Sequence, residues 1–62
     1  MNDEFKELLM ICEELRYKIV EFRYLKFKES YVSIVEVNEL GDRWKMSYQD
    51  EGWVIEWIIE IN

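Results

Sequence analysis

Several residue types are missing from this chain, and each absence excludes a kind of chemistry. The 62 residues contain no His, Pro, Thr or Ala. Without His, the chain lacks the commonest general base and the commonest metal ligand in proteins. Cys12 is the only cysteine, so an internal disulfide is impossible and no cysteine-based zinc motif is present. We therefore expect a non-enzymatic protein with no catalytic residues, no cofactor and no metal site.

Long apolar runs are also missing. The longest one, from Trp53 to Ile59, is interrupted by Glu56 and is too short to span a bilayer. The first residues do not show the charged and then apolar pattern of a secretory signal. The net charge of −6 repels both nucleic acid and anionic membrane surfaces. We expect a cytoplasmic protein that binds neither of them.

What is present is a high apolar content, 50% of the residues, which is typical of a globular chain. A length of 62 residues predicts one small domain, residues 1–62. A chain this short buries a small core, and no disulfide or metal reinforces it. Self-association is therefore an expected source of stability.

The pattern is clearest in residues 43–62, where apolar and polar side chains alternate. Alternation with period two places one set on one face of a sheet, so the sequence predicts a hairpin. Its loop, Gln49–Gly52, is expected to have Gly52 at positive φ. The predicted cross-strand pairs are Tyr48–Trp53, Met46–Ile55 and Trp44–Trp57.

The first third of the chain predicts a helix over residues 3–18, capped by Asn2 or Asp3. Its apolar residues at helical spacing are Phe5, Leu8, Leu9, Cys12 and Leu15. Residues 19–28 and 31–38 are rich in β-branched and aromatic side chains and predict two more strands. The predicted fold class is α+β, with one N-terminal helix packed on a four-stranded antiparallel meander. The alternative is a helix that continues to about residue 25, followed by a three-stranded meander suited to coiled-coil pairing.

Register follows from the requirement that the strands share one apolar face. The predicted pairs of the other two hairpins are Val37–Trp44, Val35–Met46, Phe22–Val37 and Tyr24–Val35. The resulting inner face consists of Val20, Phe22, Tyr24, Val35, Val37, Trp44, Met46, Ile55, Trp57 and Ile59. On the outer face, the same pairs predict a row of alternating charges, Arg23–Glu36–Lys45–Glu56.

Five apolar side chains fall on the outer face beside that charged row. They are Leu25, Phe27, Val32, Ile34 and Val54. A sheet with one face under a helix normally has a polar opposite face, so these residues predict a protein interface, most simply that of a two-fold homodimer. The alternative is ordinary surface apolarity. Met10 and Tyr17, seven residues apart on the outer side of the predicted helix, form a secondary candidate interface.

Other chemistry-bearing residues have simpler interpretations. Cys12 lies in the apolar stripe of the helix and is expected to be a buried structural thiol. The carboxylates of Asp50 and Glu51 fit turn chemistry, and alone they supply too few ligands for a metal. No base stands beside Ser30, Ser33 or Ser47 in the predicted arrangement.

The function expected from these patterns is that of a small acidic protein-interaction module. It would form a homodimer and would regulate, inhibit or scaffold an unidentified protein partner, and its size suits a virus- or mobile-element-encoded protein. One alternative is a small protein that binds a hydrophobic ligand between the helix and the sheet or between two subunits. Another is an acidic mimic of DNA, with the charge presented by Asp3, Glu4, Glu7 and Glu14.

Overall fold

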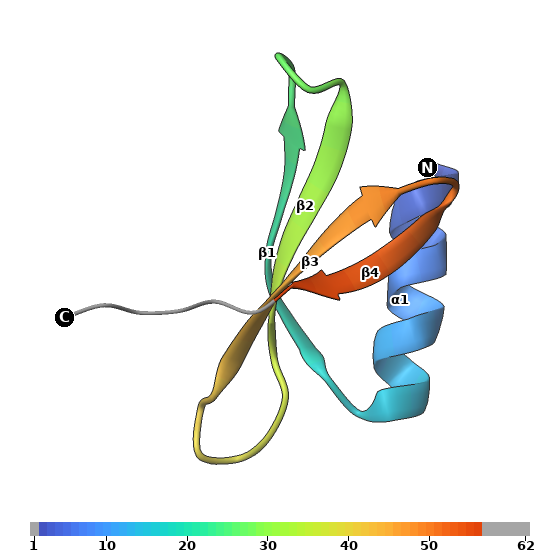
Figure 1. The fold of residues 1–62 in the computed structure, drawn as a ribbon. Helices are drawn as coiled ribbons and strands as arrows, with labels where there is room; N and C mark the ends of the chain where they lie inside the picture. Colours follow the sequence, from blue (N-terminus) through green and yellow to red (C-terminus); the bar gives the residue numbers. More distant parts are fainter. Residues whose placement is uncertain (1, 57–62) are drawn as a thin grey trace, which may run out of the picture.

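The described part of the chain forms one helix followed by a four-stranded sheet. The computed structural model describes residues 2–56, and its elements are α1 (Asp3–Leu15), β1 (Lys18–Leu25), β2 (Ser30–Glu36), β3 (Arg43–Gln49) and β4 (Gly52–Glu56). Each strand pairs antiparallel with the next, in the order β1-β2-β3-β4. Figure 1 shows α1 beside a strongly twisted sheet. The α+β class and the four-stranded meander are confirmed, and the alternative of a helix reaching residue 25 is wrong because Lys18–Leu25 is a strand.

Both ends of α1 are closed by local hydrogen bonds. The Asn2 side chain accepts a hydrogen bond from the Phe5 amide at 2.7 Å, which is a standard N-cap. At the other end Arg16 has a φ of 61°. The Arg16 amide donates a hydrogen bond to the carbonyl of Glu13, and the Tyr17 amide donates one to the carbonyl of Cys12. These two bonds form a Schellman motif. The motif ends the helix at Leu15, three residues before the predicted end, and turns the chain into β1.

The core lies between α1 and one face of the sheet. Leu8 and Cys12 of α1 and Val35 and Met46 of the sheet are its buried apolar residues. Partly buried apolar side chains surround them: Ile11, Tyr17, Ile19, Phe22, Val37, Trp44 and Trp53. The predicted inner face is therefore confirmed for its central residues, whereas Tyr24 and Ile55 are half exposed at its margin. Trp57 and Ile59, also predicted there, lie outside the described residues.

Trp53 of β4 ties the far edge of the sheet to the start of the helix. Its indole N–H donates a hydrogen bond to the backbone carbonyl of Glu4 at 2.8 Å. The ring also packs edge-on against Tyr48 at 5.6 Å between centroids and lies 6.2 Å from Phe22. Phe22 in turn meets Phe5 of α1 at 4.8 Å. Aromatic contacts of this geometry add to the free energy gained from burial alone, so this group anchors the β3–β4 hairpin under α1.

The β3–β4 hairpin has the predicted register and a different turn. The pairs Tyr48–Trp53 and Met46–Ile55 are confirmed, and Trp44–Trp57 lies outside the described residues. Gln49 pairs with Gly52, so the loop has two residues, Asp50 and Glu51, and both have positive φ. This is the type I′ geometry, whose twist matches that of the flanking strands. The prediction that Gly52 carries the positive φ is therefore wrong.

The β2–β3 register differs from the predicted one by two residues. Val35 pairs with Trp44 and Ser33 with Met46, instead of Val37–Trp44 and Val35–Met46. The cause is Asn38, whose side-chain oxygen accepts hydrogen bonds from the amides of Leu40 and Asp42. The Val37 amide donates to the carbonyl of Asp42 at 2.9 Å and closes the loop. A tight loop ordered by an Asn side chain thus sets the register.

The β1–β2 register differs by four residues and contains a bulge. Phe22 pairs with Ser33 and Tyr24 with Tyr31, so the predicted Phe22–Val37 and Tyr24–Val35 pairs are wrong. The chain reverses in a turn between Leu25 and Ser30, earlier than predicted. The pairing also shifts between Ile19 and Glu21, which leaves Val20 as the extra residue of a bulge. Val20 is 40% exposed, and Ile19 takes the place in the core that Val20 was predicted to fill.

The predicted charge row is only partly present, because it depended on those registers. Lys45 does lie opposite Glu56, with 3.5 Å between the charged groups. Glu36 lies opposite Arg43, not Lys45, and these two form an ion pair at 3.2 Å. Arg23 lies opposite Val32, far from its predicted partner Glu36, and pairs instead with Glu21 of its own strand.

Replacement of Arg16 by Gly should stabilise the protein. A non-Gly residue with a φ of 61° is strained, and Gly adopts this conformation without steric cost. We expect Arg16→Gly to raise the free energy of unfolding by about 1 kcal/mol in urea titrations. Arg16→Ala is the control, because it keeps the strain and should give no such gain. A loss of stability in Arg16→Gly would contradict this account of the C-cap.

Replacement of Trp53 by Phe should loosen the β3–β4 hairpin from the helix. The variant keeps an aromatic ring against Tyr48 but loses the hydrogen bond to Glu4. We expect the free energy of unfolding to fall by about 1–2 kcal/mol. Amide hydrogen exchange should quicken first in the opening turn of α1. Unchanged exchange there would show that the indole bond does not hold the two elements together.

Candidate functional site

The candidate site is the face of the sheet that points away from α1, called here the open face. No element of the described chain, residues 2–56, covers it. Its members alternate along each strand with the core residues. These members include Lys18, Glu21, Arg23, Leu25, Ser30, Val32, Ile34, Glu36, Arg43, Lys45, Ser47, Val54 and Glu56.

Four of the five predicted interface residues belong to the open face. Val32 and Ile34 are neighbours on β2, and Leu25 is diagonal to Val32 across the β1–β2 ladder. All three are partly exposed, and Val54 of β4 is 40% exposed and separated from Val32 by Ser47. Phe27 is elsewhere: it lies in the turn between β1 and β2 and is 81% exposed. Its placement on the face was wrong because β1 ends at Leu25.

Met10 and Tyr17, the residues of the secondary candidate interface, do not lie on a common surface as predicted. Met10 is 70% exposed on α1. Tyr17 lies beyond the helix end and packs against the core cluster. The predicted common stripe required the helix to continue past residue 17, and the Schellman motif prevents this.

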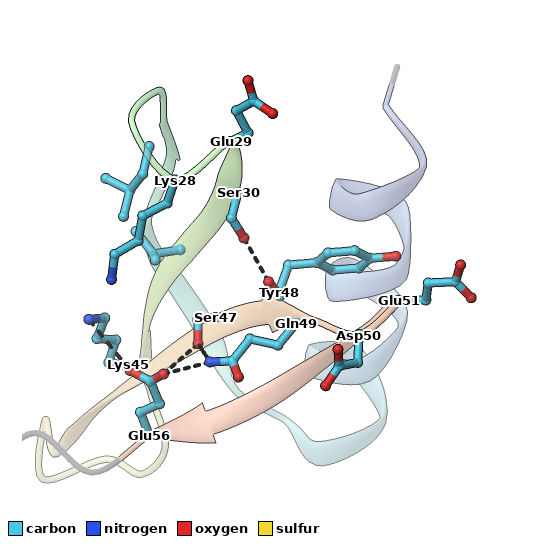
Figure 2. Close-up of a pocket in the computed structure, with 12 residues that line it drawn as sticks. Lys28, Glu29, Ser30, Lys45, Ser47, Tyr48, Gln49, Asp50, Glu51 and Glu56 are labelled. Atoms are coloured by element: carbon cyan, nitrogen blue, oxygen red, sulfur yellow. Dashed lines mark hydrogen bonds and ion pairs between the residues drawn. The ribbon is translucent and has the colours of Figure 1, made fainter.

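A groove indents the open face where the two hairpins diverge. Its volume is about 640 Å³. The β2–β3 pairing ends at Val32–Ser47, and beyond it the Ser30 hydroxyl donates to the carbonyl of Tyr48 at 2.7 Å. Figure 2 shows side chains of both hairpins around the groove. Its lining residues are Leu25, Lys28, Glu29, Ser30, Val32, Lys45, Ser47, Tyr48, Gln49, Asp50, Glu51 and Glu56.

Glu56 is the best-coordinated charged group of this groove. One of its carboxylate oxygens accepts hydrogen bonds from the Ser47 hydroxyl and the Gln49 amide, both at 2.8 Å (Figure 2). The other faces the ammonium of Lys45. The Ser47 bond, followed by the charge and hydrogen bond of Lys45 and the Gln49 bond, outweighs desolvation and lowers the pKa of Glu56. A carboxylate held ionised in this way is a poor general acid.

The serine hydroxyls and the thiol of the described chain are also committed to structural contacts. Ser30 donates to Tyr48 as above, and the buried Ser33 donates to the backbone carbonyl of Glu21 beside the bulge at 2.7 Å. Ser47 donates to Glu56. Cys12 is buried, as predicted, and burial raises the pKa of its thiol. A protonated, inaccessible thiol is unreactive.

Negative charge gathers at the helix side of the molecule. Desolvation, and then the carboxylates of Glu7, Glu4, Glu51 and Asp3, raise the pKa of Tyr48. Of the four helix acids proposed for a DNA mimic, Asp3, Glu7 and Glu14 are exposed and Glu4 is partly exposed. The carboxylates of α1 thus form an acidic surface on the side of the sheet opposite the open face, and Asp50 and Glu51 of the β3–β4 turn lie at the edge of the groove.

Within residues 2–56, no group of three or more His, Cys, Asp or Glu side chains is arranged to hold a metal ion. In the same part of the chain, no helix has the length and apolarity needed to cross a membrane. Comparison of the chain with protein-family models, with curated proteins and with solved structures gives no match.

Sequence reasoning missed the Ser47–Gln49–Glu56 network and the groove around it. The network could have been predicted from the sequence. The β3–β4 register was predicted correctly, and it places Lys45 opposite Glu56 and Ser47 opposite Val54. Ser47 and Gln49 therefore had to share a face with Glu56. The groove could not have been predicted in this way, since it depends on how far the two hairpins twist apart.

Replacement of Ser47 by Ala should raise the pKa of Glu56 towards its ordinary value, because the largest cause of the lowering is removed. A lowered carboxyl pKa stabilises the fold above the unfolded-state pKa, and this contribution is lost as the pH falls through the folded-state value. The stability deficit of Ser47→Ala should therefore be larger at neutral pH than well below the folded-state pKa of Glu56. Carboxyl NMR titration and urea unfolding at both pH values measure this. Ser30→Ala is the control and should leave the Glu56 titration unchanged.

Proposed function

We propose that this protein is a small, non-enzymatic interaction module that binds a protein partner through its open face. The observation that carries the proposal is the one-sided cover of the sheet. One helix packs on one face, while the other presents the partly exposed aliphatic side chains of Leu25, Val32, Ile34 and Val54. An antiparallel sheet with a free face is normally polar there. Grouped aliphatic residues on such a face are typical of a contact surface.

The charges of the open face support binding of a protein surface. Glu36 is paired with Arg43, Glu56 with Lys45, and Glu21 with Arg23. Groups that already have partners of opposite charge lose less solvation energy when a surface covers them than isolated charges do. The aliphatic residues thus lie among charges that are largely neutralised within the molecule.

The chemistry of the described side chains also supports a role in binding over one in catalysis. The three serine hydroxyls donate to carbonyl or carboxylate oxygens, and Glu56 is held ionised by three neighbours. The one thiol is buried. A module of this kind would regulate, inhibit or scaffold its partner by covering part of the partner's surface.

Capture of partners from a lysate of the expressing cells tests the proposal. The test variant is Val32→Glu, in which the new carboxylate lies opposite Arg23 and so disturbs the fold little. We expect it to lose the proteins that the wild type retains, because a charge on the aliphatic patch must be desolvated on binding. Met10→Glu adds the same charge on exposed α1 and should retain them. Equal capture by Val32→Glu and the wild type would exclude the open face as the binding surface.

A further inference from the structure

We propose that the partner bound at the open face is a second copy of this chain, related by a two-fold axis in the plane between the two sheets. The inference rests on the proposed function, since it concerns the same surface. Charge distribution, area and the layout of side chains on the face support it.

Charge is segregated between the two layers. Helix α1 carries five carboxylates and one lysine, a net charge of −4, out of −6 for the whole chain. The charged strand residues of the open face are Lys18, Arg23, Arg43 and Lys45 against Glu21, Glu36 and Glu56, a net charge of +1. Lys28, Glu29, Asp50 and Glu51 of the adjoining turns also line the groove in this face and bring its net charge to −1. Two identical acidic molecules would therefore repel one another much less at the open face than at α1.

Face-to-face pairing also keeps the acidic helices apart. The molecule extends 30 × 28 × 17 Å along its principal axes, and α1 packs on the side of the sheet opposite the open face. Sheets pack about 10 Å apart, so both helices would lie on the outside of the dimer. Their separation would exceed the Debye length of about 8 Å at physiological salt.

The molecule is large enough for an interface of standard size. Its extents along the two longer principal axes, 30 × 28 Å, enclose an outline of about 840 Å² that includes the helix. Each partner in a specific complex of standard size buries about 800 Å². The protomer itself buries only four apolar side chains among its described residues, Leu8, Cys12, Val35 and Met46. A second sheet would add a second apolar layer to a fold with a small core.

The order of side chains selects the direction of the two-fold axis. Two adjacent rows cross the sheet, Arg23–Val32–Ser47–Val54 and Glu21–Ile34–Lys45–Glu56. If the two-fold axis is perpendicular to the strands and passes between these two rows, the first row of one copy faces the second row of the other copy. This arrangement places Val32 on the partner's Ile34 and Arg23 on the partner's Glu21. An axis along the strands would instead place Glu21 on the partner's Glu56, so the first arrangement is favoured.

Sedimentation equilibrium of the full chain over a wide concentration range measures the predicted association. We expect a dimer, and a midpoint of urea unfolding that rises with protein concentration. Val32→Glu should raise the dissociation constant at least about tenfold. Met10→Glu is the matched control and should remain dimeric.

A charge swap between Arg23 and Glu21 tests the proposed direction of the two-fold axis. This test does not require that the Val32→Glu variant folds. Arg23 is an exposed side chain, so Arg23→Glu should fold, but it would face the partner's Glu21 and should weaken the dimer. Arg23→Glu combined with Glu21→Arg should restore it. Helix content by circular dichroism monitors folding, so a variant that merely unfolds is distinguished from a folded monomer.

A wild type that is monomeric at all concentrations would overturn the dimer. So would association that survives both Val32→Glu and Arg23→Glu in folded protein. A monomeric wild type whose Val32→Glu variant still loses a captured protein would leave the proposed function intact with a different partner. If Val32→Glu also keeps that captured protein, the proposed function fails as well.

Discussion

The contact between one stripe of α1 and one face of the sheet is the constraint on which this small structure depends. Leu8 and Cys12 meet Val35 and Met46, and the indole of Trp53 fastens β4 to the first turn of the helix. No disulfide reinforces this layer, because Cys12 is the only cysteine. Each feature that positions the stripe, such as the Asn2 cap and the hydrogen bonds of the Schellman motif, therefore stabilises the whole fold.

The same constraint explains which parts of the fold were predictable from sequence. The β2–β3 register was predicted two residues away from the observed one, and yet Val35, Trp44 and Met46 were correctly placed in or around the core. Side chains alternate with period two, so an even shift of register preserves the face of every residue while it changes every partner. Face membership is a property of each strand alone, whereas pairing also depends on the loop between strands. For this reason the core was predicted well and the Arg23–Glu36 pair was not.

The wrong predictions trace to local backbone chemistry. Asn38 orders its loop through two backbone amides, and the bulge at Val20 moves Ile19 inward. Neither feature follows from the pattern of apolar residues. For the candidate site, Leu25, Val32, Ile34 and Val54 were assigned to the open face by alternation, and Phe27 was misplaced because the strand ends two residues before it. The groove arises from the divergence of two hairpins, a property of sheet twist that no single strand carries.

The properties of the sheet edges favour association through the open face over association through an unpaired strand. An unpaired strand edge offers backbone groups to another chain, and natural proteins protect such edges with charges and bulges. Edge strand β1 has both devices: a bulge at Val20, and the charged residues Lys18, Glu21 and Arg23 along its length. Growth of the sheet from this edge is thus opposed. The open face carries three ion pairs, Glu21–Arg23, Glu36–Arg43 and Lys45–Glu56, among partly exposed aliphatic side chains. A surface built in this way favours a closed contact between two faces over open-ended pairing of strands.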